Sequence, residues 1–262
     1  PVWVQYLNWL GGVLRGDFGY SFLNNRPVSE LIRERLGWTV FLAVITIFAT
    51  WVVAIPLGIY TALRRHGFGA MLANFIGYFG LATPDFLVAL LLIFAVLSAG
   101  GTSVGGLFSP QYIDAPWSWA KFTDMLSHLW IPLIVIGLDG TAGIMRQMRA
   151  NMLDVLSQDY VRTARAKGQA ERVVIWRHAL KNALLPVVTI IGLQFGTLLG
   201  GAILTETIFS WPGIGSWGAE TATRFDVPGL LGFALLSGIL TVLANLVVDI
   251  IYALIDPRVR FD

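Results

Sequence analysis

The chain has no cysteine, few charged residues and few histidines, and each shortage excludes a class of site. Without cysteine there can be no disulfide, no thiolate-bound metal and no cysteine nucleophile. Charged residues make up only 13% of the 262 residues, against about 25% in an average soluble domain. The three histidines, His66, His128 and His178, show no HExxH-like spacing, so we interpret none of them as a metal ligand. The net charge of +2 is too small to indicate a nucleic-acid partner.

A phosphate-binding loop is missing as well. The motif GxxxxGK[ST], whose backbone cradles phosphates, does not occur, and none of the three lysines follows a glycine. No pair of polar residues within an apolar run has the spacing of a nucleophile and its base, which argues against an intramembrane enzyme. We therefore expect no catalytic residue, metal or cofactor in this chain, and no ATP hydrolysis by it.

Apolar sequence, in contrast, is abundant: 56% of the residues are hydrophobic and the mean hydropathy is +0.70. A transmembrane helix needs about 20 apolar residues, and five runs reach that length. Because the backbone must satisfy its own hydrogen bonds inside a bilayer, we predict that all five are helices and that the fold is an all-α polytopic bundle. The runs cover residues 38–62, 71–98, 127–147, 183–207 and 229–255.

Basic residues fall mainly on one side of these predicted spans. If the five spans alternate in direction, the connections 63–70 and 146–182 and the C-terminal tail lie together and hold twelve of the eighteen basic residues. By the positive-inside rule that side is the cytoplasm. The C-terminus is then cytoplasmic, and residues 1–37 lie on the opposite side.

This orientation predicts the domain organisation. Residues 1–37 form an extracytoplasmic segment, and residues 38–262 form a single transmembrane domain with a cytoplasmic region at about 146–182. Residues 1–37 contain no signal peptide that would carry them across the membrane. We therefore expect a sixth, N-terminal helix that precedes this sequence.

One connection, residues 160–182, is both basic and long. It contains six of the eighteen Lys and Arg residues and a single acid. Asp159 suits the N-cap of a helix that runs to Lys167, and Gly168 suits its end. A second helix is predicted from about Gln169, which makes the block a helix, a glycine turn and a helix.

The second helix of the block is predicted to be amphipathic, with Val173, Trp176 and Leu180 on one stripe. Two simple roles are open: a helix lying on anionic lipid, or an ordinary positive-inside loop. A connector needs only a handful of residues, however, and the length of this one favours a surface that another protein grips.

The glycine-centred block resembles the cytoplasmic signature of binding-protein-dependent ABC importer permeases. That signature reads Glu-Ala-Ala, three residues, Gly, nine residues and a hydrophobic-x-Leu-Pro end. Aligned on Gly168, the triplet falls on residues 162–164 and the end on residues 178–181. Ala164, Gly168 and Leu180 match, whereas an arginine and a lysine replace the Glu and the Pro. The missing Glu weakens only the inference that a carboxylate at this position contacts a partner.

These departures are similar to those of one branch, the dipeptide/oligopeptide/nickel permeases, in which the usual sequence is "RTARAKG" followed by "RHALKNALLP". The resemblance covers essentially the whole chain, and it implies a type I importer permease fold. Further matching stretches follow in order: "GDFGYSF" at 16–22, "ATPDF" at 82–86, "ETIFSWPGIG" at 206–215 and "DPRVR" at 256–260.

The resemblance implies that the chain forms half of the path for a peptide or a related small solute through the bacterial inner membrane. A homologous second permease forms the other half. Two ATPase subunits, which bind ATP and Mg, act on the cytoplasmic side, and a solute-binding protein delivers the solute outside. In the family an ATPase docks on the glycine-turn helix, called the coupling helix. The residues expected to couple to the ATPase are Arg162, Thr163, Ala164, Arg165, Lys167, Gly168 and Leu180.

Four acids fall within the predicted spans: Asp85, Asp139, Glu206 and Asp249. A charge at the bilayer centre costs at least ~2.5 kcal/mol, so each acid needs a reason. We assign Asp85, Asp139 and Glu206 to the translocation path. For Asp85, which follows Pro84, the alternative is a hydrogen bond that closes a kink. Asp249 is assigned to helix packing or to a gate.

The stretch "ETIFSWPGIG" is expected at the outer mouth of a span. Pro212, Gly213 and Gly215 predict a turn, and Trp211 suits a membrane–water boundary. Two roles are open for these four residues. They face the solute-binding protein, or the tryptophan only anchors the chain in the aromatic belt.

The alternative function is an autonomous channel or an ion-coupled secondary transporter. Intramembrane acids suit that function, but a glycine-hinged cytoplasmic helix of this length would have no role in it. The solute itself is open among peptides, nickel chelates, glutathione and oligosaccharides.

Overall fold

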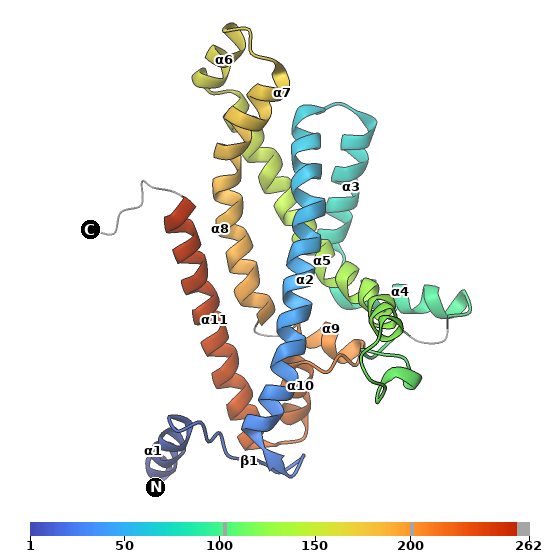
Figure 1. Ribbon diagram of the computed structural model, residues 1–262, viewed down its shortest axis with the longest axis vertical. Coiled ribbons are helices and arrows are strands. Elements are labelled where there is room, and N and C mark those ends of the chain that lie inside the picture. Colours follow the sequence, from blue (N-terminus) through green and yellow to red (C-terminus); the bar gives the residue numbers. More distant parts are fainter. Residues whose placement is uncertain (102–103, 200–201, 256–262) are drawn as a thin grey trace. The chain divides into compact units, whose positions relative to one another are not determined.

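The structure is a computed structural model that describes residues 1–101, 104–199 and 202–255, and it consists mainly of helices (Figure 1). The chain forms two compact units, each assembled from three separate stretches. The first unit contains Pro1–Ile45, Phe86–Val135 and Gly196–Leu243, and the second contains Thr46–Asp85, Ile136–Phe195 and the stretch from Ala244.

Three long helices contribute to both units: α2 (Val28–Leu63), α5 (Trp119–Leu156) and α11 (Val227–Ile255). Within the described residues these three are long and apolar enough to cross a membrane, α11 over Val227–Ile250. They coincide with the predicted spans 38–62, 127–147 and 229–255. The first of them also runs through the predicted domain boundary at 37/38.

Each of the other two predicted spans contains two helices in the described part of the chain. Span 71–98 is divided into α3 (Phe68–Ala82) and α4 (Asp85–Ser98), and it counts as a fourth span only if this bent pair crosses as one. Span 183–207 corresponds to α8 (Leu180–Leu199) and α9 (Ile203–Ile208). The predicted count of five spans is therefore not confirmed.

In the first unit, α10 (Ile214–Thr223) packs against the N-terminal part of α2. A buried cluster joins Trp217, which is 0% exposed, to Val28, Leu31 and Ile32 at the start of α2. The elements that belong only to this unit are α1 (Val2–Val13), β1 (Tyr20–Ser21), β2 (Arg26–Pro27), η1 (Pro110–Tyr112), α9 and α10.

A two-stranded antiparallel hairpin, β1–β2, precedes α2 and is fixed to the turn between α10 and α11. The carboxylate of Asp226, 2% exposed, accepts a hydrogen bond from the backbone N–H of Phe22 at 3.1 Å and another from the hydroxyl of Ser21. The stretch "GDFGYSF" therefore has a structural role here, since its serine is fully buried against this acid.

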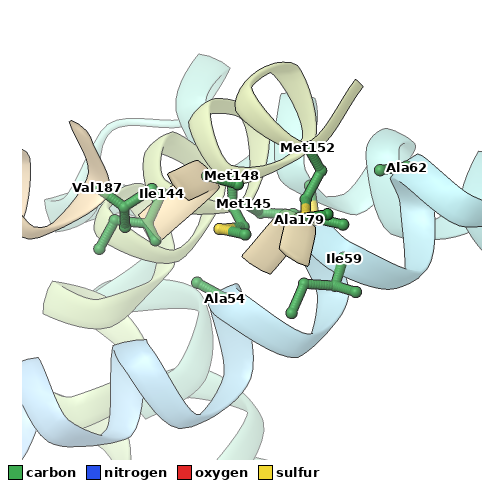
Figure 2. Packing of buried hydrophobic residues seen from close by; sticks show 10 residues of the cluster. Ala54, Ile59, Ala62, Ile144, Met145, Met148, Met152, Ala179 and Val187 are labelled. Carbon is green, nitrogen blue, oxygen red and sulfur yellow. The ribbon is translucent and has the colours of Figure 1, made fainter. Parts of the chain in front are cut away.

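The second unit packs around methionines of α5. Met145, Met148 and Met152 are almost fully buried against α2 and α8, as Figure 2 shows. Gly58 on α2 permits this approach, because a Cβ atom there would lie 2.6 Å from the Cβ of Met148. Gly77 does the same on α3, where a Cβ would lie 2.7 Å from the terminal carbon of Met145.

Candidate functional site

The glycine-turn block adopts the predicted helix–turn–helix form. Helix α6 (Asp159–Ala166) is followed by a glycine turn, then α7 (Glu171–Val173), the π-helical stretch η2 (Val174–Ala179) and α8. Figure 1 shows α6 and α7 at the end of α8. We refer to residues 159–182 as the coupling segment. Its first helix begins at Asp159, one residue earlier than predicted, because Gln158 and not Asp159 is the N-cap.

Gly168 has a φ of +75°, a conformation that residues with a side chain adopt at a cost. Its N–H bonds to the carbonyl of Arg165 at 2.9 Å, and the N–H of Gln169 bonds to the carbonyl of Ala164 at 3.3 Å. These two bonds form a Schellman motif, in which a glycine in the left-handed region ends a helix and reverses the chain. The predicted glycine stop is confirmed by this geometry.

A charged pair closes the turn from outside. The guanidinium of Arg165 donates to both carboxylate oxygens of Glu171, at 3.1 and 2.6 Å. This pairing lowers the pKa of Glu171 and raises the pKa of Arg165. Both side chains are about half exposed, so the pair restrains the turn geometry more than it stabilises the fold.

The inner face of α6 packs on the second helix of the segment. Val161 and Ala164 form a buried cluster with Val174. Polar contacts reinforce it: Asn182 donates to the hydroxyl of Tyr160 at 2.7 Å, and a 2.8 Å hydrogen bond joins the side chains of His178 and Gln169. The α6 helix is thus held against its own chain by a buried cluster and by hydrogen bonds.

The predicted apolar stripe of the second helix has a different phase in the structure. Val173 is 41% exposed and Trp176 is 59% exposed, whereas Val174 and Ala179 are fully buried. The π-helical stretch explains the difference. Hydrogen bonds from residue i to i+5 bring residues five apart onto one face, while an ideal α-helix would place them about 140° apart.

The residues predicted to couple to an ATPase divide into an outer and an inner set. Arg162, Thr163, Arg165, Lys167 and Gly168 are exposed on the turn and on the outer face of α6. Ala164 is only 6% exposed and contacts its own chain, and Leu180 is half-buried at the edge of the α5 methionine cluster. These last two contribute to the packing of the segment and not to its exposed surface.

The part of α8 that directly follows the coupling segment is attached to α5. The side-chain amide of Asn151 donates to the carbonyl of Ala183 at 3.1 Å, and Gln147 donates to Asn151 at 2.9 Å. Sequence reasoning missed Asn151 and Glu171. The single acid in a basic block was a usable signal for Glu171, whereas no local pattern marks Asn151.

Asp85 and Asp139 lie in the second unit, and both are exposed on its surface. Asp139 is near enough for its charge to act on Asp85. At the break between α3 and α4, a backbone carbonyl is satisfied by a group other than Asp85. The hydroxyl of Thr83 donates to the carbonyl of Phe79 at 2.7 Å. Asp85 itself is the first residue of α4, where a carboxylate is favoured by the helix dipole.

Glu206, the third predicted path residue, is 1% exposed and lies inside the first unit. One carboxylate oxygen accepts from the hydroxyl of Thr39 at 2.9 Å and the other accepts from the N–H of Ser216 at 2.9 Å. Its carboxylate satisfies the backbone at the start of α10, so in this structure it lines no open path.

The loop after Glu206 is enclosed as well. Trp211 is 1% exposed, and its indole N–H donates to the carbonyl of Trp38 at 3.2 Å. Gly213 and Gly215 are buried, and of the four predicted residues only Pro212 is partly exposed. Three of these four residues therefore present little surface in this chain, and a contact of the loop with a solute-binding protein stays a prediction. The stretch "DPRVR" lies outside the described residues.

Comparison with known proteins agrees with the architecture. Residues 54–261 match the family described as "Binding-protein-dependent transport system inner membrane component". The chain belongs to this family. It is accordingly an inner-membrane component of a binding-protein-dependent ABC importer and not an enzyme.

Relatives of known name cover nearly the whole chain. It is 39% identical over 263 residues to the oligopeptide transport system permease protein AppB of Bacillus subtilis, covering 100% of this chain and 81% of the relative. It is 41% identical over 276 residues to the dipeptide transport system permease protein DppB of Escherichia coli K12, covering 99% and 81%.

Two solved structures have a similar fold, although their sequence identity to this chain is low. A chain of the MetNI methionine ABC transporter in an inward-facing conformation aligns with a TM-score of 0.64 at 17% identity, covering 86% of this chain and 96% of that one. A chain of an amino acid ABC transporter aligns with a TM-score of 0.58 at 13% identity, covering 88% and 95%.

Proposed function

We propose that this chain forms one half of the membrane path of an importer for peptides, and that a homologous permease forms the other half. The peptide assignment rests on the two named relatives, which are a dipeptide and an oligopeptide permease. As in other ABC importers, the energy comes from separate ATPase subunits, and a binding protein delivers the solute.

The coupling segment is the proposed contact with the ATPase. Its geometry carries the proposal: α6 is held on α8 by a buried cluster and by hydrogen bonds, and its outer face presents Arg162, Thr163 and Lys167 to solvent. A rigid projection transmits a displacement, whereas a mobile loop would absorb it. The Arg165–Glu171 pair would hold the turn in shape while an ATPase moves it.

The proposed topology follows from the placement of basic residues. Residues 146–182 and the C-terminus face the cytoplasm, and residues 1–37 face the opposite side. Because the chain has no native cysteine, single cysteines report this cleanly. Phe22→Cys and Lys167→Cys, both at exposed positions, should react with a membrane-impermeant thiol reagent from opposite sides. Reaction from the same side would contradict the topology.

Asp85 and Asp139 are proposed to border the path. Both carboxylates are exposed on the second unit, and the groups that close the break before α4 do not include Asp85. An ionised side chain in an apolar helix is stable only beside water or a polar partner, and a hydrated path supplies water.

The test is uptake of a labelled dipeptide by liposomes that contain this chain, its partner permease, the two ATPases and the binding protein. We expect uptake that requires ATP and every component. Uptake by this chain alone would overturn the importer assignment. ATP-driven uptake of another solute but of no peptide would overturn only the peptide assignment.

A further inference from the structure

The N-terminal helix α1 presents an apolar stripe that no other part of the described chain covers. At 3.6 residues per turn, five side chains fall within about 100° of its circumference. Four of them are at least half exposed: Trp3 at 66%, Tyr6 at 56%, Leu7 at 55% and Leu14, directly after the helix, at 82%. Leu10, the fifth, is half-buried.

The opposite face of α1 is polar but carries no charge. Gln5, Asn8 and Gly12 lie there, and the helix Val2–Val13 contains no Asp, Glu, Lys or Arg. The helix is therefore amphipathic without the ionic groups that form salt bridges with a protein partner. Trp, Tyr and Leu opposite a polar face are typical of a helix at a membrane–water boundary, although the polar face here lacks the Lys and Arg that such helices often carry.

A hydrogen-bonded glycine turn ends α1 and sets the direction of the chain after it. Gly16 has a φ of +83°, its N–H bonds to the carbonyl of Val13 at 2.9 Å, and the N–H of Asp17 bonds to the carbonyl of Gly12 at 3.0 Å. This is a second Schellman motif. The carboxylate of Asp17 then accepts from the N–H of Gly19 at 2.9 Å, which orders the chain up to the hairpin.

The hairpin places α1 at the ends of two membrane-spanning helices. Asp226, one residue before α11, holds Ser21 and Phe22, and α2 begins directly after β2, at Val28. Both α2 and α11 are candidate spans, and the candidate span in α11 begins at its first residue, Val227, so this residue lies near the edge of the bilayer. A helix tethered at this point reaches the lipid headgroups.

We propose that α1 is an interfacial helix, which lies in the membrane plane with its Trp3–Tyr6–Leu7–Leu14 stripe in lipid. Trp and Tyr prefer this depth because their rings are apolar while the indole N–H and the phenol hydroxyl can bond to headgroups or water. An apolar face of this kind enters about 5–10 Å into the boundary between headgroups and acyl chains. The proposal rests on the place of the chain in a membrane and not on the peptide or the coupling assignment.

The native absence of cysteine permits a direct test. Nitroxide labels are attached to single cysteines at Trp3, Leu7 and Leu14 on the stripe, and at Gln5 and Asn8 on the polar face, in the complete transporter in liposomes. All five positions are exposed, so labelling leaves the fold intact. Collisions with molecular oxygen, which concentrates in lipid, are compared with collisions with a water-soluble nickel chelate.

We expect the ratio of oxygen to nickel collisions to be severalfold higher at the three stripe positions than at Gln5 and Asn8. A low ratio at the stripe, equal to that at the polar positions, would place the stripe in water and overturn the proposal. Exclusion of both reagents at the stripe, with an immobilised label, would show that a protein covers it and would also overturn the proposal. Neither result depends on transport, so the test is separate from that of the proposed function.

Discussion

The hydroxyl of Thr39 donates a 2.9 Å hydrogen bond to the carboxylate of Glu206, which lies 167 residues later in the chain. The same hydroxyl accepts from the N–H of Ile214 at 2.8 Å, and the second oxygen of Glu206 accepts from the N–H of Ser216 at 2.9 Å. Backbone N–H groups at a helix start have no partner within the helix. Glu206 and Thr39 satisfy two of these groups in α10, the N–H groups of Ile214 and Ser216, and Thr39 links α10 to α2.

Gly213 is required by this arrangement because of space and not because of its backbone angles. Its φ is −94°, but a Cβ atom there would lie 2.3 Å from the Glu206 carboxylate. We expect Gly213→Ala to destabilise the chain by about 1–3 kcal/mol, since overpacking displaces a buried, hydrogen-bonded group. The measurement is the thermal unfolding midpoint in detergent.

Gly238→Ala is the matched control, because nothing lies within 4 Å of a Cβ atom at that position of α11. It should unfold at the parent temperature or slightly above it, since alanine favours a helix more than glycine does. Equal midpoints for the two variants would show that the carboxylate moves aside without cost.

The long helices could be predicted because their signal is local. Apolar runs longer than the bilayer requires correctly located α2, α5 and α11. The break between α3 and α4 was harder, because a hydropathy average over residues 71–98 is high on both sides of it. Pro84 predicted a kink within one helix. In the structure two helices are separate, because Thr83, directly before Pro84, has an extended conformation.

The roles of Glu206 and Trp211 could not be predicted from their neighbours in the sequence. An acid followed by a tryptophan and glycines is typical of a surface turn. Their burial depends on Thr39 and on the carbonyl of Trp38, which approach only through the tertiary fold. Gly168 was predictable, since a glycine directly after a short polar helix is a local end signal.

The Arg165–Glu171 pair predicts a result for a charge exchange. Arg165→Glu and Glu171→Arg should each weaken ATPase-coupled transport, because each places two like charges across the turn. The double exchange should restore transport if the pair acts as a clamp. If Arg165 contacts the ATPase directly, the double exchange stays defective and the clamp interpretation is wrong.

The pH dependence of this pair has a definite sign. Because the pKa of Glu171 is lowered, its contribution is present at neutral pH and is lost only as the pH falls through that lowered value. The clamp should therefore add no pH dependence to coupling between neutral pH and the ordinary Glu range. An Arg165→Gln variant should show the same pH profile there as the parent, at lower activity.

Asp85→Asn should impair transport while the complex still assembles. The change keeps the shape of the side chain and removes its charge, at a cost of about 0.3–1 kcal/mol from the lost helix-dipole interaction. Thr83→Val is the contrasting variant, because it removes the hydroxyl that closes the break. The readouts are dipeptide uptake and the yield of assembled complex.

We expect Thr83→Val to lower the yield and Asp85→Asn to lower uptake per complex. A low yield for Asp85→Asn with normal uptake by the complexes that form would assign Asp85 to the structure of the break and not to the path.

Gly168 gives the sharpest test of the coupling segment. Its φ of +75° makes any residue with a Cβ atom strained by about 1–2 kcal/mol, although nothing lies within 4 Å of that atom. Gly168→Asn is the control, because asparagine tolerates this conformation better than most residues do. Gly168→Glu adds both the strain and an acid beside Arg165 and Lys167. We expect Gly168→Glu to insert normally but to lose ATPase binding or its coupling to transport, and Gly168→Asn to keep most of both.

The alternative to an ATPase contact is that the segment lies on anionic lipid. This alternative predicts that loss of the basic charges is more harmful than a change of Gly168. On lipid, one glycine change is mild, whereas neutralising Arg162, Arg165 and Lys167 together weakens the contact by roughly 1 kcal/mol per charge. Solute-stimulated ATP hydrolysis is measured in reconstituted complexes that carry either change. Because the Schellman turn sets the angle at which α6 meets its partner, Gly168→Glu should reduce the stimulation whatever the lipid charge. A normal response from Gly168→Glu, together with failure of the neutralised variant only in anionic liposomes, would show that the segment binds lipid and not an ATPase.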